Sequence, residues 1–416
     1  MSEPDATRDL AAPWNQAQPW RTDDAGELEI AGRPLSRIVE ATGQTPCYLY
    51  DRWRLDARVA HLRACLPAPI KLHYAIKANP IPALVGHLAR LTDGLDVASV
   101  GELRVALDAG TDPLNISFAG PGKRDAELRQ AVAAGILVNI ESPRELEALS
   151  QACESFGASA RVAVRVNLPF ELKASGMRMS GGAKQFGIDS EQVPALLADI
   201  RSRGLAFEGF HLYAGSQNLK AAAIAEAQDQ CYKMVRGWAD MMPAPLRSLN
   251  LGGGFGIPYT PSESPLDLGP VADSLAALQQ RCAQDSPQAH LVLELGRYLV
   301  AEAGLYVTRV IDRKQSRGQT FLVCDGGMHH HLAASGNFGQ VIRRNYPVMV
   351  NARPESSEIA SVVGPLCTPL DLLADRMQLG EAHVGDLVVV FQSGAYGKTA
   401  SPREFLGHPE LIEAPV

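Results

Sequence analysis

The chain has few of the features that mark secreted, membrane or nucleic-acid-binding proteins. Its 416 residues include only 7 cysteines, an odd number with no CxxC pair, which favours reduced thiols in a cytoplasm over a disulfide framework. No Lys/Arg run exceeds two residues and the net charge is −7, so neither nucleic acid nor an anionic membrane is expected as a partner. The N-terminus carries acids where a signal peptide needs basic residues, and charged residues interrupt the most apolar stretch, 291–311. We therefore expect a cytoplasmic protein.

Short strand-like runs alternate with amphipathic stretches in the central part of the chain. The runs lie at 70–76, 94–97, 114–118, 136–140, 161–166, 208–214, 247–251 and 290–295. Helix-like segments such as SPRELEALSQACESFG separate them, and this repetition is typical of parallel βα units. Eight such units predict an α/β fold built on a (β/α)8 barrel.

The pattern changes after Gly304, where strand-like runs are separated by turns with little helical periodicity. This predicts a second, mainly β domain. A similar strand-like piece, ELEIAGRPL, precedes the barrel. We therefore expect a flexible tail at 1–25, an N-terminal segment at 26–45 that joins the β domain, a barrel at 46–295 and the β domain at 296–416.

Chemistry on such barrels gathers at the C-terminal ends of the strands. Lys77 follows the first strand in HYAIKANP, where apolar surroundings could lower its pKa and prepare it for a Schiff base. Glu294 and Arg297 follow the eighth strand in ELGR. A carboxylate there could hold a pyridine nitrogen protonated, and the arginine could bind a phosphate or carboxylate. The alternatives are an ordinary strand-end lysine and a plain ion pair at the barrel rim.

Small residues end the sixth and seventh strands, in HLYAGSQ and LNLGGGFG. Gly252, Gly253 and Gly254 let backbone N–H groups approach a bound phosphate, and Ser216 can add a hydroxyl donor. The glycine run is not a dinucleotide fingerprint, because prolines follow it where that motif requires a helix. A phosphate loop within the barrel is the better interpretation.

Two other motifs look like binding sites but do not meet the requirements for one. His329, His330 and His331 would point to alternating faces of an extended chain, and no acid completes a ligand set, so no metal site is expected. GAYGKTAS resembles the end of a nucleotide-binding P-loop, but Gln392 replaces the glycine that this loop requires, so ATP binding is not expected.

Seven motifs together carry a family resemblance. HYAIKANP, DVASVGEL, HLYAGSQ, GGGFG, ELGR, GPLCTPLD and GAY occur in the order found in fold-type III pyridoxal-phosphate decarboxylases, which act on diaminopimelate, ornithine and arginine. The chain resembles this family from about Gly26 to near its C-terminus. The resemblance implies an alanine-racemase-like barrel with a β domain, pyridoxal 5'-phosphate as the cofactor, and a homodimer with shared active sites.

The resemblance also implies roles for individual residues. Lys77 would carry the cofactor covalently, and Glu294 would contact its pyridine nitrogen. Cys367 matches the thiol that reaches a neighbouring subunit's site and protonates the substrate carbon. Tyr213 stands where many relatives have a histidine stacked on the cofactor ring. The remaining matches are Asp96, Glu102 and Arg165 at supporting positions and Ser216, Gly254, Arg297 and Tyr396 at the phosphate end.

Departures from the family pattern concern the substrate. Thr368 follows Cys367, where diaminopimelate and ornithine decarboxylases have an acid suited to a distal ammonium. The arginine that follows a DAGMNDL-like segment in diaminopimelate enzymes is also missing, although Arg343 or Arg344 could substitute.

The combination of Tyr213, the GMRMSGGAKQFGI loop at 176–188 and the Cys367-Thr368-Pro369 sequence resembles a divergent branch. This branch includes decarboxylases associated with exosortase gene clusters and decarboxylases of carrier-protein-linked glutamate. We therefore favour decarboxylation of a modified or carrier-linked amino acid to its amine. Diaminopimelate decarboxylation and a non-catalytic pyridoxal-phosphate-binding protein are the alternatives.

Overall fold

The computed structural model describes residues 20–172, 176–178, 180–260, 262–338, 343–353 and 357–416. Residues 1–19 of the expected tail, and Met179, lie outside the described residues. The chain divides into two compact units. The barrel unit contains Val59–Gly256 and Leu266–Tyr298, and the β unit contains the described residues up to Arg58 together with Ile257–Pro265 and Leu299–Val416.

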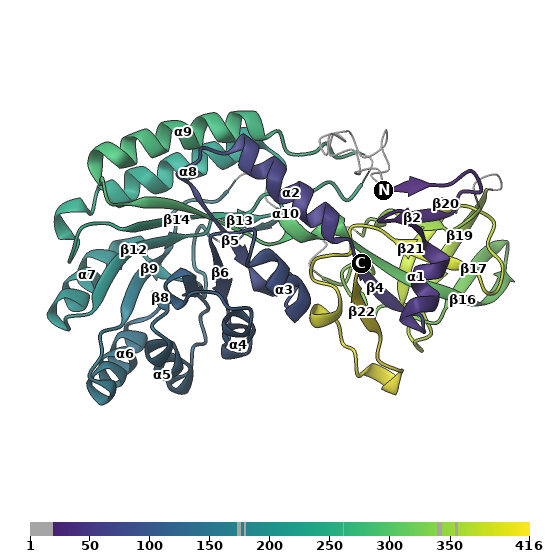
Figure 1. Ribbon diagram of the computed structural model, residues 1–416, viewed down its shortest axis with the longest axis horizontal. Coiled ribbons are helices and arrows are strands. Elements are labelled where there is room, and N and C mark those ends of the chain that lie inside the picture. The colour runs from purple at the N-terminus through teal and green to yellow at the C-terminus, as the bar shows by residue number, and fades with distance from the viewer. Residues whose placement is uncertain (1–19, 173–175, 179, 261, 339–342, 354–356) are drawn as a thin grey trace. The chain divides into compact units, whose positions relative to one another are not determined.

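Eight parallel strands close the barrel unit, which confirms the predicted fold (Figure 1). They are β5 (Lys71–Ala75), β6 (Gly94–Val97), β7 (Ile116–Phe118), β8 (Leu137–Ile140), β9 (Arg161–Asn167), β12 (Ala206–Leu212), β14 (Ser248–Gly253) and β15 (His290–Leu295). They pair in the order β9-β12-β14-β15-β5-β6-β7-β8, and β8 pairs back with β9. Because every connection is a parallel crossover, all eight carboxyl ends lie at one end of the barrel.

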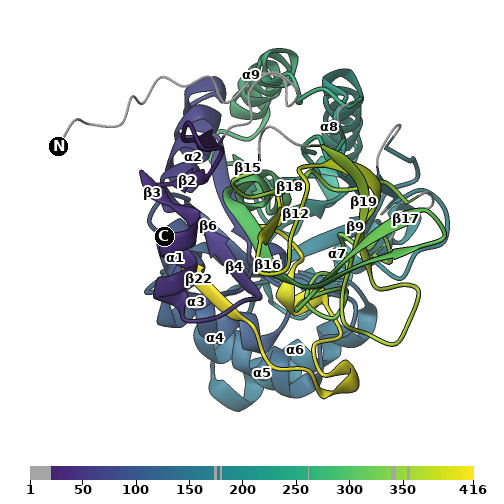
Figure 2. The same cartoon turned by 90° about the vertical axis from the view of Figure 1, so that its right-hand side faces the viewer.

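Helices surround these strands as a ring (Figure 2). They are α3 (Pro82–Leu88), α4 (Val100–Asp108), α5 (Asp125–Ala134), α6 (Pro143–Phe156), α7 (Val193–Ser202), α8 (Ala221–Arg236) and α9 (Leu268–Asp285). Each buries one apolar stripe; α8, for example, buries Ile224, Cys231 and Val235. Gly135 and Gly157 end α5 and α6 in the left-handed conformation that favours glycine. Helix α10 (Arg297–Val300) follows β15 directly.

The β unit is mainly a sheet, as predicted. Its strands are β16 (Gly304–Ser316), β17 (Gln319–Cys324), β18 (Val348–Val350), β19 (Glu358–Val363), β20 (Leu372–Leu379) and β21 (Leu387–Val390), paired in the order β18-β21-β16-β17-β19-β20. No α-helix follows Gly304 among the residues that the structure describes. Strand β4 (Cys47–Tyr50) pairs with β16 and with β22 (Ile412–Pro415).

The N-terminal part of the chain shares the core of the β unit. Strands β1 (Arg21–Thr22), β2 (Leu28–Ile30) and β3 (Arg33–Pro34) form a small sheet, and α1 (Leu35–Thr42) follows them. Leu28, Ile30 and Leu35 pack in one hydrophobic cluster with Leu305 and Val389. Residues 46–58 group with this unit through the β4–β16 pairing, and α2 (Arg52–Cys65) begins there.

In the β unit, His329 and His330 lie in a turn that His331 directly follows, and not in the extended chain that the sequence analysis assumed. His331 Nε2 lies 2.9 Å from Ser393 Oγ, and His330 Nε2 lies 3.2 Å from the carbonyl oxygen of Pro409. Burial lowers the pKa of His329 to about 4 and that of His331 to about 3. The His331 ring packs against aromatic side chains. A lowered pKa keeps an imidazole neutral, and the neutral form tolerates such burial.

No helix in the described part of the chain is both long and apolar enough to cross a membrane.

Candidate active site

A lysine and a buried carboxylate meet at the C-terminal end of the barrel strands. Lys77 lies in a short turn, Ile76–Ala78, directly after β5, and Glu294 lies near the end of β15. Lys77 Nζ is 3.3 Å from Glu294 Oε1, while His211 Nε2, from β12, is 2.8 Å from Glu294 Oε2. The Lys77 side chain is 44% exposed and that of Glu294 is 4% exposed. The site therefore offers an accessible amine next to a buried carboxylate.

The charges around Glu294 keep it ionised. Burial alone would raise the pKa of its carboxyl, but the charge of Lys77, the hydrogen bond from His211 and the charge of Arg165 outweigh burial. The pKa of Glu294 is consequently held well below its usual range. An ionised carboxylate at this position can accept a hydrogen bond from a protonated ring nitrogen.

Asp96 lies on β6 in a polar cluster inside the barrel. Its Oδ1 contacts His73 Nδ1 at 3.3 Å and accepts a hydrogen bond from Ser117 Oγ. Its Oδ2 is buried and has no hydrogen-bond partner among the described residues, and the same is true of His211 Nδ1. Buried polar atoms normally find a partner in protein, water or ligand. These two atoms therefore fit a polar ligand bound at the strand ends.

Glu102 has a structural role in addition to its predicted one. Its Oε2 accepts a hydrogen bond from the backbone N–H of Ala98 at 2.7 Å, and its own N–H donates to Ser99 Oγ at 3.2 Å. This arrangement caps the start of α4. Burial raises the pKa of Glu102, whereas the charge of Lys77 lowers it and that of Glu294 raises it further, so this carboxylate also faces the site.

Arg165 extends from β9 into the barrel interior. It is paired with His211 of β12 in the strand ladder, which places it next to the His211–Glu294 pair. Its Nη1 donates to Glu141 Oε1 at 2.9 Å, and its guanidinium lies 5.0 Å from the centre of the Phe186 ring. The sequence analysis did not identify Glu141.

Two hydroxyls and an aromatic ring lie at the end of β12. Tyr213 Oη and Ser216 Oγ are 3.0 Å apart, and Lys77 Nζ is 5.4 Å from the centre of the Tyr213 ring. Ser216 belongs to the two-residue strand β13 (Gly215–Ser216). Tyr213, which is predicted to stack on the cofactor ring, and Ser216, which is predicted to contact the phosphate, are therefore adjacent.

The glycine run ends β14 where backbones approach closely. Gly252 and Gly254 have φ values of +67° and +74°, which favour glycine. A Cβ on Gly254 would overlap the carbonyl oxygen of Gly215, and one on Gly253 would overlap that of Glu294. Glycine is required here by strand packing, and the same small residues leave the backbone accessible to a ligand.

The predicted residues of the β unit lie on two loops. Cys367 is the exposed cysteine of the chain's seven, on the loop between β19 and β20. Tyr396 has φ +54° and its ring centre lies 5.9 Å from that of Phe338. Arg297, by contrast, belongs to the barrel unit, where it begins α10 three residues after Glu294.

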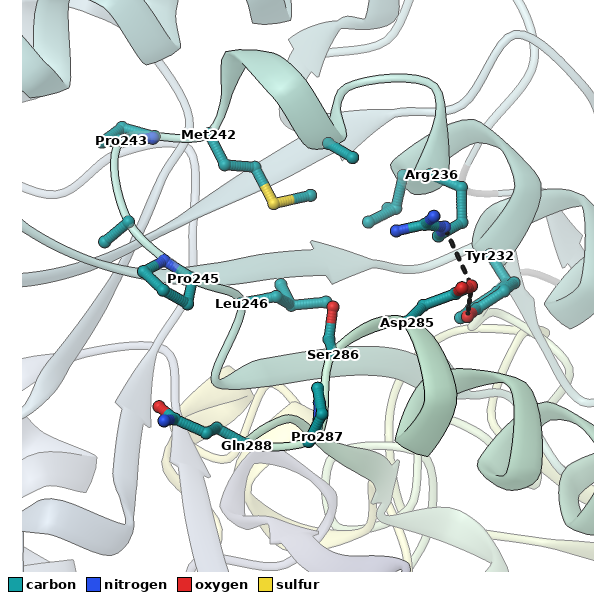
Figure 3. A pocket seen from close by; sticks show the side chains of 13 residues that line it. Tyr232, Arg236, Met242, Pro243, Pro245, Leu246, Asp285, Ser286, Pro287 and Gln288 are labelled. Carbon is teal, nitrogen blue, oxygen red and sulfur yellow. Dashed lines mark hydrogen bonds and ion pairs between the residues drawn. The ribbon is translucent and has the colours of Figure 1, made fainter.

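A pocket of about 530 Å³ lies at the other end of the barrel (Figure 3). Leu246 and Gln288, which precede β14 and β15, help to line it, together with Tyr232 and Arg236 of α8. Asp285 Oδ2 accepts hydrogen bonds from the Tyr232 hydroxyl at 2.7 Å and Arg236 Nε at 2.9 Å. This pocket is remote from Lys77, because the catalytic ends of parallel strands face the opposite way.

His211 and Glu141 are the site residues that sequence reasoning missed. A signal for His211 was present in HLYAGSQ, because residues two apart on a strand share a face, and Tyr213 had been identified. Glu141 reads in ESPRELEAL as part of a helix start, and nothing local indicates its partner Arg165.

Comparisons with known proteins agree with the geometry. The family model for pyridoxal-dependent decarboxylases, pyridoxal binding domain, matches residues 53–301. L-glutamyl-[BtrI acyl-carrier protein] decarboxylase of Niallia circulans is 39% identical over 379 residues, 89% of this chain and 88% of that protein. 2-[(L-alanin-3-ylcarbamoyl)methyl]-2-hydroxybutanedioate decarboxylase of Staphylococcus aureus is 30% identical over 391 residues, 91% of this chain and 96% of that protein.

A solved structure gives the same result. Diaminopimelate decarboxylase from Helicobacter pylori, complexed with L-lysine, matches with a TM-score of 0.81 and 27% identity, over 92% of this chain and 94% of that one. The predicted family, fold and cofactor are therefore confirmed. The chain belongs to the pyridoxal-dependent decarboxylase family.

Proposed function

We propose that this chain removes the α-carboxyl group from an amino acid whose distal end is joined to another group, such as a carrier protein. The observation that carries the proposed reaction is the exposed Lys77 amine 3.3 Å from the ionised, buried Glu294 carboxylate. Pyridoxal phosphate, when bound, supplies an electron sink for the pair of electrons that departing carbon dioxide leaves behind.

We assign each part of this cofactor to particular residues. We assign Lys77 to the covalent attachment and Glu294 to holding a proton on the pyridine nitrogen. The ring of Tyr213 offers a stacking surface near Lys77. The phosphate end is assigned to Ser216, Gly252, Gly253, Gly254, Arg297 and, from the β unit, Tyr396. Asp96, Glu102 and Arg165 surround the ring side.

Cys367 is the proposed acid that returns a proton to the former α-carbon. Its thiol is exposed, whereas the other six cysteines are buried or partly buried, which supports a chemical role over a packing role. We infer that it acts in the site of a second subunit in a homodimer. The free state of all seven thiols, each in the described part of the chain, supports a cytoplasmic location.

The loop that carries Cys367 supports the proposed substrate. Thr368 has no negative charge to compensate a distal ammonium, and its Oγ1 accepts a hydrogen bond from the backbone N–H of Leu370 at 3.3 Å. Asp371, the acid of this loop, is 3% exposed and accepts backbone hydrogen bonds from Leu366 and Met328. Its carboxylate is therefore already bonded inside the β unit.

A free diamino acid would bring an uncompensated ammonium to this loop, and an unpaired desolvated charge costs several kcal/mol. Two relatives act, by their names, on a carrier-linked glutamyl group and on an alanin-3-yl group joined through a carbamoyl link. Neither name describes a free diamino acid. Both therefore support a distal end that is covalently linked and carries no ammonium group.

A competition assay tests this substrate. Because the α-carboxyl must be free to leave, the probe is the thioester of pantetheine with the distal carboxyl of L-glutamate. It is mixed at equal concentration with free glutamate, lysine, ornithine and meso-diaminopimelate, and the amines are measured by mass spectrometry. We expect at least ~100-fold preference for the thioester, because 1.4 kcal/mol corresponds to a factor of ten.

Thr368→Glu should shift this preference towards amine-ended substrates, with Thr368→Ser as the control that keeps the hydroxyl. Selective turnover of free meso-diaminopimelate by the unaltered protein would instead identify a diaminopimelate decarboxylase, the function of the Helicobacter pylori protein. Binding of the cofactor without carbon dioxide release from any probe would identify a non-catalytic pyridoxal-phosphate protein.

A further inference from the structure

Four charged side chains are buried together behind the candidate active site. Lys123, Glu141 and Glu145 are each at most 2% exposed, and Arg165 is 9% exposed. Two positive and two negative groups make the cluster neutral, provided that all are ionised. A buried ion cluster contributes little net stability compared with apolar side chains of the same size. Its presence therefore calls for a reason other than stability.

The cluster links three loops at the C-terminal end of the barrel. Lys123, between β7 and α5, donates to the carbonyl oxygen of Gly120 at 2.7 Å and pairs with Glu145 Oε1 at 3.0 Å. Glu145 Oε2, from α6, accepts the backbone N–H of Glu141 at 2.9 Å. The Lys123–Glu145 pair therefore fixes the backbone of the residue that holds Arg165.

Three hydrogen-bond donors surround the Glu141 carboxylate. Oε1 accepts from Arg165 Nη1 at 2.9 Å and from the backbone N–H of Gly120, and Oε2 accepts from the backbone N–H of Gly187 at 3.1 Å. Burial raises the pKa of Glu141, but the charges of Arg165 and Lys123 outweigh burial and hold it below its usual range. Glu141 is thus an ionised group with three donors fixed around it.

Arg165 connects this cluster to the reaction site. In the β9–β12 ladder it is the partner of His211, whose Nε2 bonds Glu294. The charged and titratable groups that act on Glu294 are Lys77 from the turn after β5, His211 from β12, Arg165 from β9 and Glu102 from α4. A guanidinium fixed at this position contributes a constant positive charge beside the pair.

We propose that Glu141 is a positioning residue that holds the Arg165 guanidinium beside the His211–Glu294 pair, and that the buried Lys123–Glu145 pair fixes Glu141 for this task. The proposal rests on the proposed function only in that the barrel site binds pyridoxal phosphate. It assigns the cluster to cofactor electrostatics and not to the stability of the fold.

Glu141→Gln is the direct test. Any orientation of the new amide turns its NH2 towards an N–H donor, since donors occupy both carboxylate oxygens. In either orientation the variant leaves at least one of these donors unpaired and removes the negative charge facing Arg165, so its hold on Arg165 is weakened at almost unchanged volume. The matched control is Glu208→Gln, because Glu208 pairs with Arg161 at 2.6 Å on the same strand β9 but at its opposite end.

Two readouts separate positioning from stability. The affinity of apoenzyme for pyridoxal phosphate should fall about tenfold in Glu141→Gln, equivalent to about 1.4 kcal/mol. The pH midpoint of the bound cofactor's absorption band should shift, because the Arg165 guanidinium is no longer held at a fixed position beside the His211–Glu294 pair. Glu208→Gln should lower the melting temperature comparably and leave the affinity and the midpoint unchanged.

If Glu141→Gln does not fold, Glu145→Gln serves instead, since its amide oxygen can still accept the Glu141 N–H while the charge facing Lys123 is lost. It should change both readouts in the same direction. Equal affinities and midpoints in the Glu141 or Glu145 variant and in Glu208→Gln would overturn the positioning role. Failure of the unaltered protein to bind pyridoxal phosphate would contradict the proposed function as well, so the two failures are distinguishable.

Discussion

His211 Nε2 and Glu294 Oε2 are 2.8 Å apart, although 83 residues separate them in the chain. Both side chains are buried, and the imidazole is one of the groups that hold the pKa of Glu294 low. The barrel thus brings together two residues of which sequence motifs revealed only one. This relationship leads to the first prediction.

His211→Phe should weaken binding of pyridoxal phosphate to the apoenzyme by at least ~10-fold, because a hydrogen bond to a charged group contributes about 1.5–3 kcal/mol. A group whose pKa is depressed on folding stabilises the protein above its ordinary pKa and loses that contribution as the pH falls. Without His211 the pKa of Glu294 should rise towards its ordinary value, so this carboxylate should contribute less stability at neutral pH and lose less of it as the pH falls. Fluorescence titration measures the affinity, with His290→Phe at the opposite end of β15 as control; equal affinities would count against the assignment.

Gly254→Ala should destabilise the protein by at least ~1–3 kcal/mol and reduce cofactor binding. The new Cβ would meet the Gly215 carbonyl oxygen at a φ of +74°. Gly86→Ala is the control, because a Cβ added to this helical glycine would meet no other described part of the chain within 4 Å, apart from its own helix. The change should stabilise α3 by ~0.5–1 kcal/mol. Urea denaturation of both variants measures the difference, and equal stabilities would contradict the packing argument.

Cys367→Ala should reduce kcat by ~10²–10⁴-fold, the usual range for a lost acid catalyst. If the sites are shared, mixing Lys77→Ala with Cys367→Ala subunits should restore about a quarter of the sites, because half of the randomly formed dimers are mixed and each has one intact site. The measurement is carbon dioxide release after complete subunit exchange. Absence of recovered activity would argue for a thiol that serves its own subunit.

His329 provides a pH test in the β unit. Its two ring nitrogens are buried and have no hydrogen-bond partner in the described part of the chain, and burial lowers its pKa to about 4. The unfolded chain therefore binds one more proton as the pH falls from about 6.5 towards 4, so stability declines over that window by ~1.4 kcal/mol per pH unit. His329→Phe should remove this contribution. Urea denaturation at pH 7.5 and pH 5 measures how the free energy of unfolding depends on pH. In His329→Phe this dependence should be weaker by about one proton, and an unchanged dependence would contradict the prediction.

Much of the barrel was predictable because each strand has a recognisable local sequence pattern. The runs near Leu72, Val138 and Leu293 are buried on both faces, as parallel strands require, and the structure places strands at all eight predicted positions. The pairing of β4 with β16 was not predictable in this way, because it joins residues more than 250 positions apart. Local patterns contain no information about that partner.

The same contrast between local patterns and long-range contacts applies to the residues of the candidate active site. Lys77 and Glu294 stand at strand ends, where the barrel architecture itself identifies reactive positions. Glu141 and Lys123 act through partners in other loops, so their local sequence reads only as helix starts and turns. Buried networks of this kind are specified by tertiary packing and become visible only in three dimensions.

The attachment of the cofactor tests the central claim most directly. The purified protein is reduced with borohydride, digested and mapped by mass spectrometry to find the lysine that carries the pyridoxyl group. We predict the modification on Lys77, the lysine whose Nζ lies 3.3 Å from the Glu294 carboxylate. A pyridoxyl group on any other lysine, such as Lys123, would contradict the assignment of the active site.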